Sequence, residues 1–142
     1  MYDFQANLAP RSFPRAIASG ITGFTWYTLE GPGWYYSSLL DENQVPKPAY
    51  YSYQTMLEMI GNATLIGPVS YGTGIEAYTF HRGAFRIDII FAVENTTYTI
   101  NIPQAEYLSA FDRFGNLITP ALTGSGYSLT IQYEPIYLVR AR

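Results

Sequence analysis

Cysteine is absent from this chain of 142 residues, and histidine occurs once, as His81. The lack of cysteine excludes disulfides, thiolate chemistry and cysteine-ligated metal sites. A single histidine excludes a multi-histidine metal centre within one copy, and a Ser-His-Asp triad would have to use His81. The sequence therefore predicts no metal site and no cofactor.

Charged residues are also scarce, at 13%, whereas aromatic residues reach 17%. Disordered chains show the opposite balance, so we expect a folded protein. The net charge is −3 and the few Lys and Arg are scattered. Without a basic stripe to neutralise phosphates, we expect no nucleic-acid partner. No apolar run reaches the roughly 18 residues of a membrane span, so we expect no membrane partner. The first five residues do not resemble a signal peptide.

Residues 1–66 are predicted to form a helix, a strand and a second helix. Residues 1–19 show helical spacing of apolar side chains, with a kink or restart predicted near Pro10. Gly20 is a natural residue to end this helix. Residues 21–29 carry no charge and are rich in β-branched and aromatic side chains. This composition is typical of a strand buried on both faces, as in a parallel sheet.

The second helix is predicted to begin at Pro48, which suits the first helical position, and to end at residues 61–62. Its apolar stripe consists of Tyr50, Tyr53, Leu57 and Ile60, widened by Ala49 and Met56. Such a stripe favours core packing over a cofactor site. The helix-strand-helix order of a parallel α/β sheet occurs only once here, yet a single parallel strand cannot make a sheet.

Residues 67–142 change to a period of two, which predicts short strands. These strands are expected at residues 75–80, 85–93, 98–103, 107–111, 117–119, 127–131 and 136–139. In the second of them, Ile87, Ile89 and Phe91 lie on one face, and Arg86 and Asp88 on the other. The fold class is therefore α+β: a helix-strand-helix part over residues 1–66 and an antiparallel β-sandwich over residues 67–142.

Four segments together resemble the end of a glycoside hydrolase (β/α)8 barrel. They are Phe24-Thr-Trp-Tyr-Thr28, Gly31-Pro-Gly-Trp34, Leu39-Leu-Asp41 and Pro46-Lys-Pro-Ala-Tyr-Tyr51. The resemblance is to the retaining clan that includes families 5 and 39. It implies that residues 1–66 are a barrel remnant ending in the last strand and helix. Segments such as Pro135-Ile-Tyr-Leu138 resemble the small sandwich that follows the barrel in such enzymes.

This resemblance implies that the chain is a C-terminal portion without catalysis of its own. The family's acid/base glutamate and its nucleophile, at the ends of barrel strands four and seven, would both lie before Met1. It also implies substrate-binding roles for three residues. Trp26 would form the floor of the sugar site, Glu30 would contact a sugar hydroxyl, and Trp34 would line the rim. The alternatives are core packing for Trp26, a solvated loop position for Glu30 and burial for Trp34.

Three functions remain open at this stage. The first is the C-terminal fragment of a glycoside hydrolase, whose partners would be a carbohydrate and either the missing barrel portion or a second copy. The second is a standalone carbohydrate-binding or interaction module. The third is a small hydrolase that uses Glu30 with Asp41 or Glu42. A secreted or cell-surface location follows if the parent enzyme degrades polysaccharides.

Overall fold

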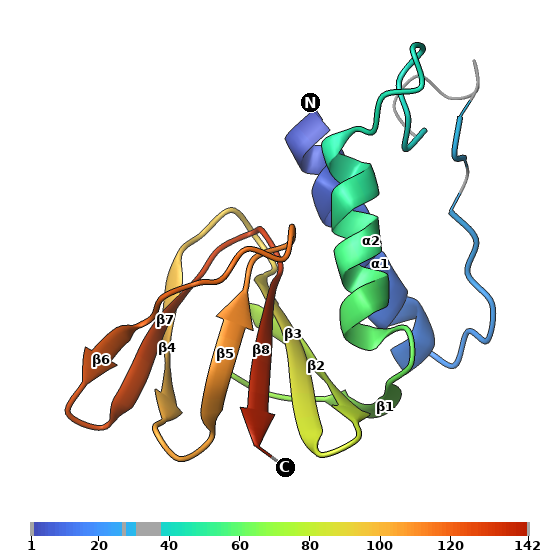
Figure 1. Cartoon of the computed structure of the whole chain (residues 1–142). Helices are drawn as coiled ribbons and strands as arrows, with labels where there is room; N and C mark the ends of the chain where they lie inside the picture. The colour runs from blue at the N-terminus through green and yellow to red at the C-terminus, as the bar shows by residue number, and fades with distance from the viewer. Residues whose placement is uncertain (1, 27, 31–37, 142) are drawn as a thin grey trace.

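The computed structural model describes residues 2–26, 28–30 and 38–141. In these residues two helices, α1 (Tyr2–Ala18) and α2 (Pro48–Ile60), precede eight strands (Figure 1). The strands are β1 (Thr64–Pro68), β2 (Ile75–Arg82), β3 (Phe85–Ala92), β4 (Tyr98–Pro103), β5 (Tyr107–Phe111), β6 (Ala121–Thr123), β7 (Gly126–Ile131) and β8 (Ile136–Ala141). The fold is mixed α+β with antiparallel sheets, which confirms the predicted class at that level.

Helix α1 runs from Tyr2 to Ala18 without a break, although two prolines lie inside it. The restart predicted near Pro10 is therefore wrong, whereas the alternative, a kink there, stays a prediction. Pro10 has no N–H to donate to the carbonyl of Ala6, one helical turn earlier. The hydroxyl of Ser52 in α2 donates to that carbonyl oxygen instead, at 2.6 Å. Because the neighbouring helix satisfies the group that the proline leaves free, α1 can continue.

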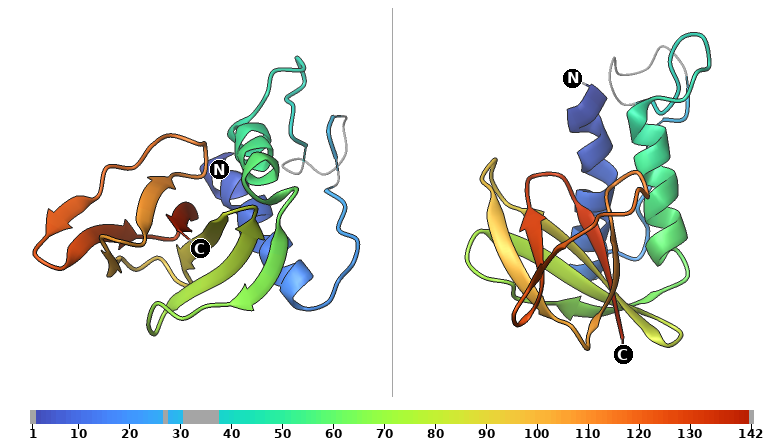
Figure 2. Two further views of the ribbon diagram at one scale, coloured as in Figure 1. Left: turned by 60° about the horizontal axis from the view of Figure 1, so that its bottom comes forward. Right: turned by 60° about the vertical axis from the view of Figure 1, so that its left-hand side comes forward.

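Helix α2 begins at Pro48 and is capped by Gly61, as the sequence predicted. Its buried face differs from the predicted stripe, because Leu57 is 46% exposed. The buried residues are Ala49, Ser52, Thr55, Met56 and Ile60. Small side chains on this face let α2 lie close beside α1, whose Ala6 and Ala9 are also buried (Figures 1 and 2).

The strands form two antiparallel sheets. The five-stranded sheet has the order β1-β2-β3-β8-β5, and the three-stranded sheet has the order β4-β7-β6. The strands predicted at residues 75–80, 85–93, 98–103, 107–111, 127–131 and 136–139 are confirmed. The short strand predicted at residues 117–119 is wrong, because only an isolated bridge joins Phe111 to Leu117 there.

Two strands were not predicted from the sequence. Strand β1 contains Gly67 and Pro68, which are turn-forming residue types, and β6 is only three residues long. Because β1 pairs with β2, the sheet begins immediately after α2. The division into parts at about residue 66 stays a prediction.

The five-stranded sheet lies between the helices and the three-stranded sheet (Figure 2). One hydrophobic cluster joins the helices to this sheet: Ala9, Met56, Ile60, Phe80, Ile87, Ile89, Phe91 and Tyr137. A second cluster joins the two sheets: Ala77, Ile90, Ile100, Ile102, Ala110, Leu129, Ile131, Ile136 and Leu138. Successive residues of β3 thus enter different clusters, which confirms the predicted alternation of that strand.

Arg11 ties α1 to the ends of the strands. Its guanidinium donates hydrogen bonds to the carbonyl oxygens of Ala92, Val93 and Tyr133, at 2.9, 3.2 and 2.7 Å. The guanidinium carbon also lies over the rings of Phe91 and Tyr133, 4.3 and 3.8 Å from their centroids. Burial lowers the pKa of Arg11, but these carbonyls and rings surround the cation with favourable partners.

Residues 21–29 follow α1 as an irregular segment, so the strand predicted there is wrong for the described residues. Gly20, at φ +81°, ends the helical path as the sequence predicted. The segment is not buried on both faces either: Ile21, Phe24 and Leu29 are 49, 42 and 52% exposed. Tyr27 lies outside the described residues.

The backbone of this segment explains the difference. A strand is stabilised by hydrogen bonds to neighbouring strands. Residues 22–25 form no backbone hydrogen bond within the described part of the chain. At the start of the segment the N–H of Ile21 donates to the carbonyl of Ala16 at 3.0 Å. At its end the carbonyls of Thr28 and Leu29 accept bonds from the N–H groups of Leu39 and Leu40, at 3.1 and 2.9 Å. A β-prone sequence therefore stays irregular because no described strand of this chain lies beside it.

Candidate functional site

Trp26 belongs to an aromatic cluster on the outer side of the helices. It is half-buried, and its ring centroid lies 6.4 Å from that of Tyr53 in α2. Phe13 of α1 lies 5.6 Å from Tyr53 and 4.3 Å from Phe24. The cluster attaches the irregular segment to both helices. This packing leaves the predicted sugar-binding role of Trp26 as a prediction.

Glu30 is exposed at the end of the same segment. Its carbonyl oxygen accepts a hydrogen bond from the hydroxyl of Thr28, at 3.2 Å. The carboxylate forms no ion pair with another described residue, so it is available to solvent or ligand. Trp34 lies outside the described residues, so its predicted role also stays a prediction.

Asp41, a possible partner of Glu30 in the third hypothesis, shapes a tight loop. Its Oδ1 accepts hydrogen bonds from the N–H groups of Asn43 and Val45, both at 2.8 Å. Asp side chains commonly cap turns in this way. The loop lets Leu40 and Pro46 form an antiparallel bridge. Asp41 thus has a structural role here, and its pairing with Glu30 for catalysis stays a prediction.

Lys47 begins a buried polar cluster at the start of α2. Its Nζ donates to Ser38 Oγ at 2.6 Å, and its backbone N–H donates to the carbonyl of Leu39 at 2.9 Å. Gln5 of α1 donates from Nε2 to the carbonyl of Ser38 at 3.1 Å. These bonds fasten residues 38–40 to both helices. The lysine of the Lys-Pro-Ala-Tyr-Tyr segment is therefore a buried anchor rather than a surface charge.

A second buried polar group lies between the sheets, where the sequence predicted only a polar strand face. Asp88 of β3 is fully buried. Its carboxylate accepts hydrogen bonds from Tyr71 at 2.5 Å and Thr79 at 2.6 Å, and pairs with Arg140 at 2.6 Å. Arg140 also pairs with Glu106 at 2.7 Å. Burial and the negative charge of Asp88 raise the pKa of Tyr71.

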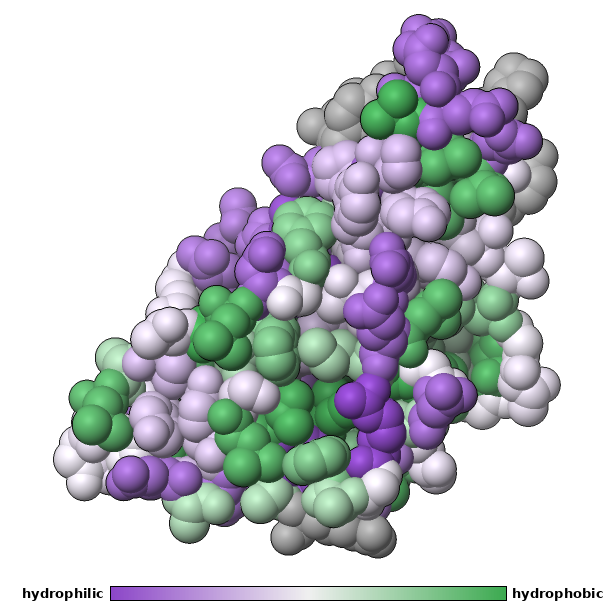
Figure 3. Space-filling model, viewed as in Figure 1, coloured by the Kyte–Doolittle hydropathy of each residue, from purple (hydrophilic) through white to green (hydrophobic). Residues whose placement is uncertain are grey.

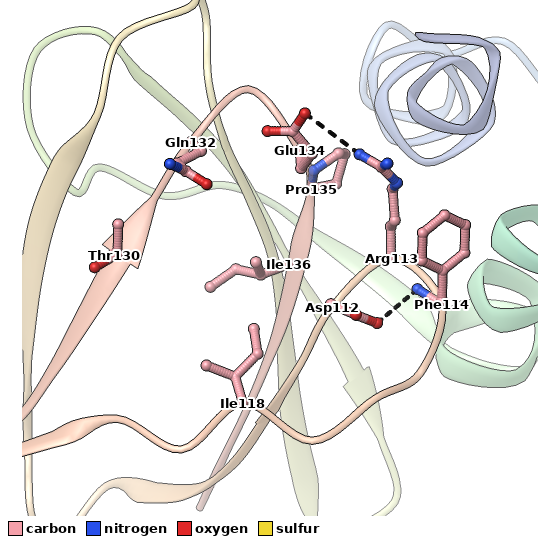
Figure 4. A pocket seen from close by; sticks show the side chains of 9 residues that line it. All are labelled: Asp112, Arg113, Phe114, Ile118, Thr130, Gln132, Glu134, Pro135 and Ile136. Carbon is pink, nitrogen blue, oxygen red and sulfur yellow. Dashed lines mark hydrogen bonds and ion pairs between the residues drawn. The ribbon is translucent and has the colours of Figure 1, made fainter. Parts of the chain in front are cut away.

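A cavity of about 290 Å³ lies between the β5–β6 and β7–β8 loops. Its lining residues are Asp112, Arg113, Phe114, Ile118, Thr130, Gln132, Glu134, Pro135 and Ile136. Figure 4 shows Ile118, Thr130, Gln132 and Ile136 around the hollow, with Arg113 and Phe114 on the side of the helices. No sequence pattern predicted this cavity, because its lining combines the β5–β6 loop with residues of β7, the β7–β8 loop and β8.

The wall of the cavity beside the helices is rigidly held. Arg113 donates to Asn7 Oδ1 at 2.8 Å and pairs with Asp3 at 3.1 Å and Glu134 at 3.4 Å. Asp112 Oδ1 accepts hydrogen bonds from the N–H groups of Phe114 and Asn116, at 2.8 and 2.9 Å. These contacts fix the β5–β6 loop against α1 beside the cavity.

No protein-family model matches the sequence, and no curated protein matches it. Solved structures do match the fold. A family 39 glycoside hydrolase from the gut symbiont Bacteroides cellulosilyticus WH2 aligns over 99% of this chain and 31% of its own, with a TM-score of 0.75 and 16% identity. The fold therefore resembles that of part of this glycoside hydrolase.

Two xylanases with the same glycoside hydrolase fold give similar alignments. A family 30 subfamily 8 xylanase from Clostridium acetobutylicum aligns over 99% of this chain and 39% of its own, with a TM-score of 0.68 and 4% identity. A family 30 endoxylanase from Clostridium papyrosolvens C71 aligns over 100% of this chain and 39% of its own, with a TM-score of 0.64 and 10% identity. The chain therefore spans less than half the length of these structures.

The described residues hold no group of His, Cys, Asp and Glu side chains suited to a metal ion. Among the same residues, neither helix is long and apolar enough to cross a membrane.

Proposed function

We propose that this chain is the C-terminal portion of a (β/α)8-barrel glycoside hydrolase of the retaining clan that includes families 5 and 39. The observation that carries the proposal is the match in fold over 99% of this chain to only 31% of a family 39 enzyme. In this proposal, residues 1–66 complete the barrel and residues 67–142 form the accessory sandwich. The remaining barrel strands belong to a preceding part of the same enzyme.

The irregular segment at residues 21–29 supports this proposal. It is rich in residues that favour strands, yet residues 22–25 form no backbone hydrogen bond within the described chain. Ile21 and Phe24 are exposed on it. Unpaired backbone groups beside exposed apolar side chains are what a strand presents when its sheet neighbours are missing. We infer that this segment becomes the last barrel strand when the preceding part of the enzyme is present.

The positions of Trp26 and Glu30 fit the same proposal. Active sites of such barrels lie at the C-terminal ends of the strands, and both residues lie in the second half of the proposed strand or just after it. Trp26 would then stack on a sugar ring, Glu30 would contact a hydroxyl, and Trp34 would line the rim. A retaining glycosidase needs two carboxyl groups roughly 5 to 5.5 Å apart. We propose that both come from the preceding part of the enzyme, so this chain alone is inactive.

The test is complementation between two polypeptides. This chain is co-expressed with the polypeptide that the preceding coding region encodes, and hydrolysis of aryl glycosides is measured on the purified complex. Thr25→Pro removes one backbone donor from the proposed strand. We expect this variant to abolish complementation without changing the free energy of unfolding of the isolated chain, where Thr25 has no partner. The matched control, Thr25→Val, keeps a β-branched side chain and should complement normally.

Two results would contradict the proposal. One is activity in the isolated chain that Glu30→Gln abolishes, which would favour the small hydrolase. The other is a coding region that lacks barrel strands upstream, together with oligosaccharide binding that Trp34→Ala removes. That outcome would favour a standalone carbohydrate-binding module, which the cavity of about 290 Å³ also makes a serious candidate.

A further inference from the structure

The cavity between the β5–β6 and β7–β8 loops has no role in the proposed catalysis. At about 290 Å³ it lies at the lower limit of ligand-binding pockets, so it suits one small ring rather than a large ligand. Ile118 and Ile136 provide apolar surface on one side of the hollow (Figure 4). Ile136 is buried and belongs to the cluster between the sheets. The apolar part of the cavity is therefore a fixed part of the core.

The other sides of the hollow carry polar groups that have no partner in the fold. The hydroxyl of Thr130 and the side-chain amide of Gln132 form no hydrogen bond with another described residue. Both residues are exposed, and Figure 4 shows both beside the hollow. A hydroxyl and an amide can each donate and accept hydrogen bonds. The cavity thus offers apolar contact and uncommitted hydrogen-bonding groups to the same ligand.

The charges at the cavity disfavour anionic ligands and metal ions. Two carboxylates, Asp112 and Glu134, and one guanidinium, Arg113, line it. The carboxylate of Asp112 already accepts hydrogen bonds from N–H groups of its own loop, and Arg113 already pairs with Asp3 and Glu134. An anion would meet surplus negative charge, and the described residues hold no cluster that could bind a metal ion. A neutral ligand fits best.

We propose that this cavity binds one neutral sugar ring of an oligosaccharide, outside the catalytic centre. A pyranose has apolar C–H faces and hydroxyl groups around its edge, which match Ile118 and Ile136 on one side and Thr130 and Gln132 on the other. Glu134 at the rim accepts a further hydroxyl. The choice of a sugar among neutral ligands rests on the proposed function. The cavity would hold a glycan chain on the sandwich while the barrel acts elsewhere on the chain.

The test uses the whole chain, labelled with ¹⁵N and at isoleucine methyl groups, and titrated with xylotetraose, cellotetraose or sorbitol. Xylotetraose is chosen because two structures of the same fold are xylanases. We expect chemical-shift changes at the Gln132 side-chain amide and the Ile118 and Ile136 methyl groups. Gln132→Ala and Thr130→Val should each weaken binding about five-fold, the value of one neutral hydrogen bond.

The matched controls are residues of the same types that do not line the cavity. Thr99 is the cross-strand neighbour of Thr130, and Gln104 is an exposed glutamine. Thr99→Val and Gln104→Ala should change the dissociation constant by less than about two-fold, as expected for surface substitutions. The ¹⁵N spectrum of each variant shows whether it is folded. Absence of shifts at millimolar oligosaccharide, shifts centred away from the cavity, or equal binding of sorbitol would overturn the proposal.

The titration and the complementation experiment test the sugar site and the proposed function separately. Gln132→Ala lies outside the catalytic machinery and should leave hydrolysis of a small aryl glycoside by the complemented enzyme unchanged. Binding in the cavity without complementation would reject the proposed function and leave a carbohydrate-binding module. Complementation without binding would keep the proposed function and reject the sugar site.

Discussion

Ser52 Oγ lies 2.6 Å from the carbonyl oxygen of Ala6, the group that Pro10 leaves without its helical donor. Ser52 is fully buried, so this hydrogen bond is shielded from water. This bond stabilises both helices, because it completes the hydrogen bonding of α1 and fixes the position of α2. A helix with an internal proline is thus stabilised by one hydroxyl of its neighbour.

We predict that the cost of losing this hydroxyl depends on Pro10. Ser52→Ala should lower the free energy of unfolding by about 2 kcal/mol, because it leaves the buried carbonyl of Ala6 unpaired. In a Pro10→Ala background, residue 10 regains an N–H for that carbonyl, so the cost should be smaller. Urea unfolding of the two single variants and the double variant gives the coupling. Equal costs in both backgrounds would contradict the prediction.

A second prediction concerns Asp88 and Arg140, which are both buried between the sheets. Asp88→Asn should lower the free energy of unfolding by about 3 kcal/mol, because the buried guanidinium loses its closest charge partner. Glu106→Gln removes the other carboxylate that contacts Arg140, but that carboxylate is half exposed. Its cost should stay below about 1 kcal/mol. If urea unfolding shows similar losses of unfolding free energy for both variants, burial does not decide how much each carboxylate stabilises the fold.

The ion pair between Arg15 and Glu76 predicts a loss of stability in acid. Burial alone would raise the pKa of Glu76, but hydrogen bonds from Arg15 and Tyr78 together lower it below its ordinary value of 4.5. The unfolded state therefore binds the proton more tightly. The stabilisation is present above pH 4.5 and is lost as the pH falls through the lower pKa of the folded state.

Thermal unfolding between pH 6 and pH 2 checks this prediction, since acid should destabilise the Glu76→Gln variant less than the parent chain. Glu94→Gln, at an exposed turn, is the control and should follow the parent. If the parent chain and the Glu76→Gln variant lose the same stability between pH 6 and pH 2, the prediction is wrong.

The exposed segment predicts self-association of the isolated chain. Ile21 and Phe24 are exposed beside an unpaired backbone, which favours pairing with another chain. Light scattering should show species larger than a monomer, and Phe24→Lys should reduce them. Phe85→Lys is the control, because Phe85 is 46% exposed but lies in β3, which is paired on both sides. Figure 3 shows that exposed hydrophobic side chains lie over the strands as well. A monomeric parent chain would reject the prediction.

Local patterns in the sequence predicted most of the strands, because burial of one face gives a strand a period of two. Strand β3 shows the predicted faces, since Ile87, Ile89 and Phe91 enter the cluster below the helices and Ile90 enters the cluster between the sheets. The same pattern could not show that Asp88 is buried, because a second sheet covers the face that carries it. Pro10 misled the prediction of α1 for a related reason: its compensating donor, Ser52, lies in another helix.

Residues 21–29 show the limit of composition as a guide. Their β-branched and aromatic side chains favour a strand, but strand formation needs a partner that the described chain does not contain. Trp26 illustrates the same point for the candidate site, because its sequence context predicts sugar contact while its ring lies beside that of Tyr53 in α2. The cavity is lined by residues of two strands and two loops that only the folded chain brings together, so no local motif predicted it.

The clamp made by Arg11 has a consequence for fragmentation of the chain. Because one guanidinium binds the carbonyls of Ala92, Val93 and Tyr133, α1 is held to the strands by contacts that need no intact connection to α2. A protease that cuts between the two helices should therefore yield a nicked protein whose pieces co-elute on a sizing column. The N-terminal piece should separate only in denaturant.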